Sequence, residues 1–407
     1  MLRRVFLIFS TLFFIHLLVA CGGSSGSASI TPTLTPTFGT PSSTHDGFTV
    51  QITNYDTTYT YSGTATSSGT VTVSGTGLVT VTGLATNTNS TATITTTKTG
   101  AINGSASVTA TSLLPRVAYV ANTDDDTVSV IATVNNTVTA TIPVGRLPIG
   151  LVISPDGSKV YVSNQADNTV SVIATATNTV TATIPVGSSP AGLVISPDGS
   201  KLYVSNFADN TVSVIATTTN TSSATISVGS LPSRLAISPD GSKLYVSNLA
   251  DNTVSVITTT TNTSSAPISV GNSPDAIAVT PDGSKVYVSN SGDHTVSAID
   301  TATNTVTATI PVGISPIGLV ISPDGSKVYV SNSSDNTVSV IATATNTVTA
   351  TIPVGSLPSI LAISPDGSKV YVSNSGDKTV AVITTTTNTI SATIPVGSNP
   401  YAIAISP

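Results

Sequence analysis

The chain has no glutamate and no tryptophan, and it contains one cysteine, one methionine and three histidines. Only 8% of its 407 residues are charged, against about 25% in an ordinary soluble domain. One cysteine excludes an internal disulfide, and three histidines argue against a metal site or catalytic base built from histidine. The 13 basic residues are spread thinly, so we expect no nucleic-acid partner, because phosphate binding needs clustered Lys or Arg.

The residues that are abundant favour strands. Thr, Val, Ser and Ile dominate, and they suit extended backbone, whereas the good helix formers Leu, Lys and Arg are scarce. The formal net charge is −6 and the isoelectric point is about 4.8. This composition predicts an all-β protein outside the cytoplasm that is suited to binding more than to catalysis, with no cofactor.

The amino terminus has the layout of a secretory signal peptide. Two arginines, Arg3 and Arg4, precede an apolar run over residues 5–19, and small residues follow. A membrane-spanning helix is the alternative, but spanning takes about 20 apolar residues and this run is shorter. We therefore expect residues 1–20 to be a signal peptide.

The end of this segment, Leu18-Val19-Ala20-Cys21, resembles the lipobox of bacterial lipoproteins. That resemblance implies that Cys21, the only cysteine, becomes the first mature residue and carries the lipid. Several acyl chains on one residue would anchor the protein firmly to a membrane. The expected location is the bacterial cell envelope, after export across the cytoplasmic membrane. A plain signal peptide with an incidental cysteine is the alternative.

Two segments follow the lipobox. Residues 21–45 are nearly all Gly, Ser, Thr and Pro, a composition that cannot bury a core and predicts a lipidated linker. Residues 46–112 hold about six short runs of alternating polar and apolar residues with Gly or Asn between them, which predicts a two-sheet sandwich. The stretch from Val71 to Leu84 resembles Ig-like modules of bacterial surface proteins. We expect this module to be a spacer, with ligand binding as the alternative.

Residues 114–407 consist of seven copies of a 42-residue unit. Ser154-Pro-Asp-Gly recurs every 42 residues up to Ser364, with Thr280 in place of Ser in one copy. Tyr161-Val-Ser-Asn recurs at the same spacing, with a variant at Tyr119. Each copy contains four strand signals separated by turn residues. Four strands in about 40–45 residues, repeated, predict the blades of a β-propeller. An open solenoid is the alternative, but the terminal copies do not look like polar caps.

The motifs Tyr-Val-Ser-Asn, Thr-Val-Ser-Val-Ile, Thr-Ile-Pro-Val-Gly and Ser-Pro-Asp-Gly resemble the YVTN-type β-propeller repeat family of bacterial and archaeal surface proteins. The third residue of the first motif is Ser or Ala here where the family name has Thr. The expected fold is therefore all-β, a seven-bladed β-propeller preceded by a small Ig-like β-sandwich.

The points at which the repeat array begins and ends within the 42-residue unit predict how the ring closes. The first copy lacks an innermost strand, and the chain ends on an unpaired apolar run, so residues 401–406 should complete the blade built from residues 116–144. Strands alternate in direction, so the Pro-Asp-Gly and Thr/Asn-rich turns share one face, the uniform face. The loops that follow the second and fourth strands share the other face, the variable face.

Copies differ mainly on the variable face. Uniform positions suit a scaffold, whereas recognition needs different residues at equivalent places, so this face is the expected site for a protein or glycan ligand. Neutral drift at exposed loop tips is the alternative. The candidate binding residues are Arg146, Gln165, Phe207, Arg234, Asp275, His294, Lys378 and Tyr401.

Chemistry-bearing motifs are few. The repeated aspartates, such as Asp156 and Asp167, favour turns because the side chain bonds the local backbone. The run Asp124–Asp126 has carboxylates for Ca²⁺ but lacks the spacing of a known Ca²⁺ loop. We find no catalytic residues and no nucleophile–base pair. We therefore expect a binding protein without enzymatic activity, with a lactonase-like propeller hydrolase or a passive surface coat as alternatives.

Overall fold

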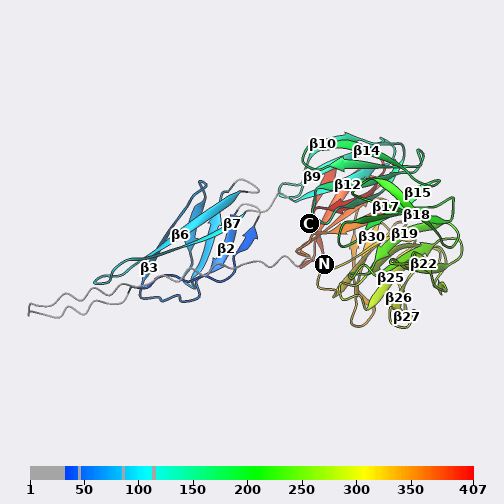
Figure 1. The fold of residues 1–407 in the computed structure, drawn as a ribbon. Coiled ribbons are helices and arrows are strands. Elements are labelled where there is room, and N and C mark those ends of the chain that lie inside the picture. Colours follow the sequence, from blue (N-terminus) through cyan, green and yellow to red (C-terminus); the bar gives the residue numbers. More distant parts are fainter. Residues whose placement is uncertain (1–32, 45–46, 85–87, 112–115) are drawn as a thin grey trace, which may run out of the picture. The chain divides into compact units, whose positions relative to one another are not determined.

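The structure is a computed structural model that describes residues 33–44, 47–84, 88–111 and 116–407. The signal peptide, the lipobox and Cys21 lie outside the described residues. Strands and turns make up the described part of the chain, in which no helix occurs that could cross a membrane. The chain divides into two compact units, Met1–Leu114 and Pro115–Pro407 (Figure 1).

The first unit is a sandwich of two antiparallel sheets around one apolar core, as the alternating pattern predicts. Phe48 and Val79 from one sheet and Ile94 from the other are fully buried in that core. One sheet has the order β1 (Ser42–Thr44), β2 (Gly47–Gln51), β5 (Leu78–Thr82), β4 (Thr70–Val73), and the other has the order β3 (Thr60–Ala65), β6 (Asn89–Thr97), β7 (Gly104–Thr111).

Part of the segment expected to be linker lies against this sandwich. Ser42–Thr44 pairs with β2, and Phe38 forms an isolated bridge with Ile52. The hydroxyl of Thr96 donates a hydrogen bond to the carbonyl of Leu34. Composition alone could not locate these contacts, because Ser and Thr occur both in linkers and in strands at the edge of a sheet.

The second unit is a β-propeller of seven antiparallel sheets (Figure 1). Neighbouring innermost strands contact each other all the way round, including β36 with both β11 and β32, so the ring is closed. The innermost strands are β11 (Pro148–Ile153), β15 (Pro190–Ile195), β19 (Pro232–Ile237), β24 (Pro274–Val279), β28 (Pro316–Ile321), β32 (Pro358–Ile363) and β36 (Pro400–Ile405).

The second strands carry the Tyr-Val-Ser-Asn motif and are the most deeply buried. Their tyrosines are 0–1% exposed because apolar residues of the next blade cover them. These strands are β8 (Val117–Asn122), β12 (Lys159–Asn164), β16 (Lys201–Asn206), β20 (Lys243–Asn248), β25 (Lys285–Asn290), β29 (Lys327–Asn332) and β33 (Lys369–Asn374).

The third and fourth strands complete each blade. The third strands are β9 (Thr127–Ala132), β13 (Thr169–Ala174), β17 (Thr211–Ala216), β21 (Thr253–Thr258), β26 (Thr295–Asp300), β30 (Thr337–Ala342) and β34 (Thr379–Thr384). The fourth are β10 (Thr137–Pro143), β14 (Thr179–Pro185), β18 (Thr221–Ser227), β22 (Thr263–Ser264) with β23 (Ile268–Ser269), β27 (Thr305–Pro311), β31 (Thr347–Pro353) and β35 (Thr389–Pro395). Only the fourth blade has a divided outer strand, where Pro267 stands and cannot donate to the ladder.

The predicted closure of the ring is confirmed. Strand β36 pairs antiparallel with β8, with Ile403 opposite Val120 and Ile405 opposite Ala118. The last strand of the chain thus supplies the innermost strand of the first blade. This pairing covers two strand edges that would otherwise be open.

The turn chemistry is also as predicted. In the uniform-face turn of the second blade, Asp156 Oδ1 accepts hydrogen bonds from the Ser154 hydroxyl and from the Ser158 backbone N–H. Gly157 supplies the positive φ of +69° that this turn requires. These two bonds hold the pKa of Asp156 at about 2, below the usual 3.8. The repeated aspartates of this face are therefore turn residues.

Candidate binding site on the variable face

The variable face is built from two loops per repeat that contact each other. In the first such pair, the N–H of Gln165 donates to the carbonyl of Leu147 over 2.9 Å. The N–H of Arg146 donates to Asp167 Oδ2 over 2.7 Å. The same hydrogen bond joins the N–H of Ser188 to Asp209 and recurs in every repeat. An aspartate of each blade therefore holds the adjacent loop in place. The assignment of these loops to one face is confirmed.

Two candidate residues, His294 and Lys378, occupy a special backbone position. Their φ angles are 59° and 57°, in the left-handed region, where the equivalent residues of four repeats are asparagines. An asparagine such as Asn168 accepts the N–H of Ser189 through its side-chain oxygen. His294 Nδ1 accepts the N–H of Ser315 in the same way, over 3.2 Å. The ring of His294 thus takes over the structural role of an asparagine amide.

Arg146, Gln165 and Phe207 lie on loops around the face. Arg146 Nε forms an ion pair with Asp167 Oδ1 at 2.7 Å, and its side chain is 69% exposed. This hydrogen bond raises the pKa of Arg146 above its usual value. Gln165 and Phe207 are half-buried, and the backbone N–H of each donates to the loop that leads into its own blade. These residues make local contacts with adjacent loops.

Arg234, Asp275 and Tyr401 converge at the centre of the ring, although they stand on β19, β24 and β36. Arg234 Nε lies 3.9 Å from Asp275 Oδ1, and the two side chains are only 13% and 14% exposed. The guanidinium carbon of Arg234 lies 5.2 Å from the centroid of the Tyr401 ring. A cation, an anion and a phenol therefore share one partly buried position on the variable face.

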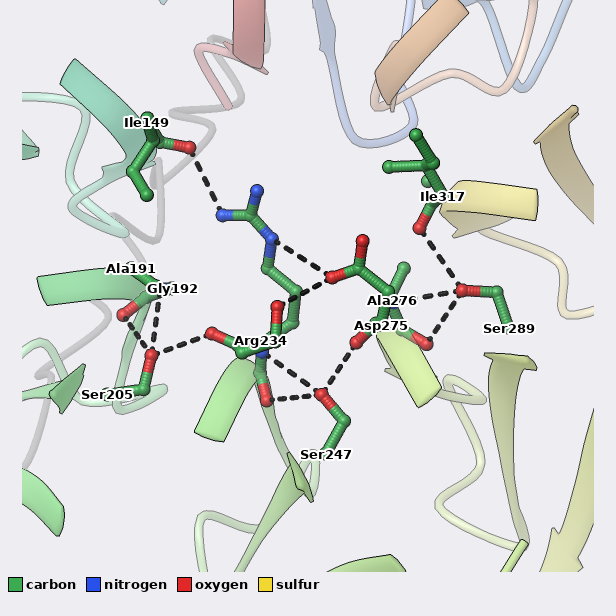
Figure 2. Close-up of polar contacts among 12 residues, drawn as sticks. Ile149, Ala191, Gly192, Ser205, Arg234, Ser247, Asp275, Ala276, Ser289 and Ile317 are labelled. Atoms are coloured by element: carbon green, nitrogen blue, oxygen red, sulfur yellow. Dashed lines mark hydrogen bonds and ion pairs between the residues drawn. The ribbon is translucent and has the colours of Figure 1, made fainter. Parts of the chain in front are cut away.

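Arg234 reaches across the centre to a blade that is not its neighbour. Its Nη1 donates to the carbonyl of Ile149 on β11 over 3.1 Å (Figure 2). Its Nε is buried and has no hydrogen-bond partner among the described residues. Asp275 Oδ1 also accepts the hydroxyl of Ser233 over 2.6 Å. The hydrogen-bonding capacity of this cluster is therefore only partly used.

Five of the other six repeats have Gly or Ala at the position of Arg234, and the sixth has Ile360. A Cβ built on the equivalent Gly150 would lie 2.2 Å from the carbonyl oxygen of Ala191, and one on Gly318 would lie 2.4 Å from that of Ser359. A long side chain at this position therefore needs an altered local arrangement. The repeat geometry itself gives no reason for an arginine there.

Tyr401 has an environment unlike that of a surface phenol. Burial raises its pKa, the charge of Asp275 raises it further, and Arg234 opposes both effects. Ser359 donates its hydroxyl to the backbone carbonyl of Tyr401 over 3.1 Å, which fixes the strand that carries the ring. The tyrosine stays protonated at neutral pH and can donate or accept a hydrogen bond.

Of the eight candidate residues, the structure brings together Arg234, Asp275 and Tyr401 and leaves the other five on the surrounding loops. Sequence reasoning left Ser233, which holds the Asp275 carboxylate, out of the candidates. The available signal was its place directly before Arg234, at the repeat position that Asp275 and Tyr401 also occupy.

No described group of three or more His, Cys, Asp or Glu side chains could hold a metal ion. In the run Asp124–Asp126 the three carboxylates face different partners: Asn399 Nδ2, the N–H of Ser398 and the N–H of Leu147. These carboxylates accept hydrogen bonds from the loops that connect the first blade to its two neighbours.

Clefts on the uniform face lie between neighbouring blades. One of about 250 Å³ is lined by Asp156 and Lys159 of the second blade and by Asp198 and Thr217 of the third. Equivalent clefts of about 370 and 230 Å³ occur farther round the ring. Because the same residue types line each of them, these clefts follow from the repeat.

Comparisons with known proteins agree with the propeller fold. The model of the YNCE-like beta-propeller family matches residues 240–326 and 325–407, and that of the family "Lactonase, 7-bladed beta-propeller" matches residues 174–266. A search of curated proteins finds no match.

Many solved structures resemble the chain, including these two. Hydrazine synthase from Kuenenia stuttgartiensis has a TM-score of 0.61 and 24% identity, over 66% of this chain and 92% of that one. A functionally unknown protein from Desulfotomaculum acetoxidans DSM 771 has a TM-score of 0.65 and 21% identity, over 71% and 98%. At these identities the similarity establishes the fold alone.

Proposed function

We propose that this protein is a lipid-anchored component of the bacterial cell envelope whose YVTN-type propeller binds a protein or glycan through its variable face. The observation that carries the proposal is the cluster of Arg234, Asp275 and Tyr401. These residues differ from their equivalents in the other repeats, yet three blades bring them to one place. Partly buried charged and aromatic side chains that converge on one spot are typical of binding sites.

A binding experiment tests this role. The variant Arg146→Ser, Arg234→Ser, Asp275→Ser, Tyr401→Ser should lose binding to the ligands found on a glycan array or among defined envelope proteins. A matched variant, Val134→Ser with Lys327→Ser, changes the uniform face and should retain it. Unchanged binding by the first variant would rule out the variable face as the site.

The anchor is tested separately. Palmitate labelling of the expressed protein should be lost in Cys21→Ala and retained by the wild type, because acylation needs the thiol. The same variant should be released from the membrane fraction. Labelling that persists without Cys21 would contradict the lipoprotein assignment.

A lactonase-like hydrolase is the second candidate, favoured by the match of residues 174–266 to a lactonase propeller model. Against it, the chain has no glutamate, and His294 is the only histidine of the propeller. Purified protein should show no lactone hydrolysis. Turnover that survives metal chelation and is lost in Arg234→Ser or Asp275→Ser would overturn the non-enzymatic role.

A further inference from the structure

The two faces of the propeller carry different charge. The variable face has ten aspartates, which are Asp124–Asp126, Asp275, and Asp167 with its five equivalents. Its basic residues are three, Arg146, Arg234 and Lys378, so the formal side-chain charge is −7. The uniform face has seven aspartates and seven basic residues, which balance. The formal net side-chain charge of the propeller therefore lies on the variable face.

Several of the loop carboxylates of the variable face reach solvent. Asp209, Asp251 and Asp335 are exposed, and each accepts a backbone N–H of the adjacent loop over 2.6 Å. The bond from the Ser188 N–H lowers the pKa of Asp209. Because one such aspartate stands in every blade, the carboxylates form a ring around the central cluster.

Aliphatic side chains stand at the tips of the same loops. Leu147, Ile314 and Leu357 are 39%, 47% and 51% exposed. Leu147 and Leu357 adopt left-handed φ angles of 53° and 51°, where equivalent repeats have Ser189 and Ser273. Leucine is disfavoured in this conformation and gains little here from burial. Folding therefore does not account for them.

We propose that the variable face docks a polypeptide whose surface combines Lys or Arg with apolar side chains. This inference rests on the proposed function and narrows its ligand to a basic protein. A charge of −7 complements a cationic surface, whereas it offers a neutral glycan nothing and repels an acidic one. The aliphatic tips can bury apolar side chains of a partner, as exposed apolar groups at protein interfaces do.

Probes of defined chemistry test this directly. A labelled peptide of repeated Lys-Leu-Gly should bind the full chain, and a matched Glu-Leu-Gly peptide should not. Opposite charges speed the encounter, so the association rate should fall steeply as salt rises. The rate of dissociation should depend much less on salt.

Variants that neutralise aspartates on one face at a time compare the contributions of the two faces to binding. Asp209→Asn, Asp251→Asn and Asp335→Asn together keep an oxygen that accepts the loop N–H but remove three charges. We expect the association rate with the Lys-Leu-Gly peptide to fall about tenfold at low salt. The control variant, Asp198→Asn, Asp240→Asn and Asp324→Asn, removes the same charge from the uniform face and should change the rate little.

A second variant and its control test the aliphatic side chains at the loop tips. Leu147→Ser with Leu357→Ser introduces the residue that other repeats carry, so the fold should be unaffected. Dissociation of the peptide should become about tenfold faster if each leucine buries much of its side chain. Val134→Ser removes an aliphatic side chain that is 81% exposed on the uniform face and should have no effect.

The outcomes distinguish this inference from the proposed function. Equal slowing by both aspartate variants would mean that charge acts without a defined surface, and the inference would be wrong. Binding of only a glycan or the acidic peptide, lost in Arg234→Ser with Tyr401→Ser, would also overturn it but leave the proposed function standing. If no probe requires the variable face, both fail.

Discussion

The guanidinium of Arg234 lies 5.2 Å from the ring centroid of Tyr401, although these residues belong to strands of the fourth and first blades. Arg234 also donates to the carbonyl of Ile149 in the second blade. One side chain thus joins three blades across the centre of the ring. Asp275 from the fifth blade lies 3.9 Å away and supplies the opposite charge.

Removing the charge of Arg234 should destabilise the protein. In Arg234→Gln the largely buried carboxylate of Asp275 loses its cation, and we expect the free energy of unfolding to fall by about 1–3 kcal/mol. Urea unfolding measures this. Arg146→Gln is a suitable control, because Arg146 pairs with Asp167 at the surface and its loss should change the free energy of unfolding little. Adding Asp275→Asn should recover part of the loss, and a failure to do so would show that the two charges are not coupled.

Removing the last strand should open the ring. A chain that ends at Gly397 lacks β36 and leaves the first blade without its innermost strand and β8 without its partner. Thermal unfolding should begin at a much lower temperature and lose its cooperativity, because two strand edges and the apolar contacts of Ile403 are exposed. Protease cleavage within residues 116–144 should accelerate. A melting curve like that of the full chain would disprove the role of this closure.

Stability should fall as the pH drops below about 4. Five aspartates of the uniform face have folded pKa values of about 2, below the usual 3.8, because neighbouring hydroxyl and N–H groups bond the ionised form: Asp156, Asp198, Asp240, Asp282 and Asp324. A carboxyl whose pKa is lowered by folding stabilises the folded protein at pH values above 3.8. That stabilisation is lost as the pH falls towards 2. Since these groups are exposed, each contributes modestly.

The measurement is a series of urea midpoints from neutral pH to pH 2. The midpoint should be flat near neutrality and decline below about pH 4. Asp198→Asn with Asp240→Asn should flatten the decline, because the amide does not titrate. A decline that begins near pH 6 would point to a different titrating group.

Restoring the repeat residue at Lys378 should stabilise the fold. Asparagine adopts the left-handed φ of 57° more readily than lysine, and its side-chain oxygen can accept a loop N–H, as Asn336 does from Leu357 over 2.9 Å. We expect Lys378→Asn to add about 0.5–1 kcal/mol to the free energy of unfolding. The reciprocal change Asn336→Lys should cost a similar amount. The same sign for both changes would contradict this account.

Much of the fold could be predicted from the sequence because the repeat encodes it locally. The turn at Ser154-Pro-Asp-Gly needs only its own side chains and a glycine with positive φ. The missing innermost strand of the first copy also predicted the pairing of β36 with β8. The roles of His294 and Lys378 were not predicted, because a residue that breaks a repeat can mark either a ligand contact or a substitute for an asparagine.

The sequence by itself determined the seven blades, their turns, the closure of the ring and the face on which copies differ. Those features follow from short-range patterns repeated every 42 residues. Only the tertiary structure decided that Arg234, Asp275 and Tyr401 meet, because the reach of one side chain across the ring depends on where each innermost strand ends. It likewise decided which candidates stay apart, since contacts across the ring are set by the geometry of seven blades rather than by neighbours in the chain.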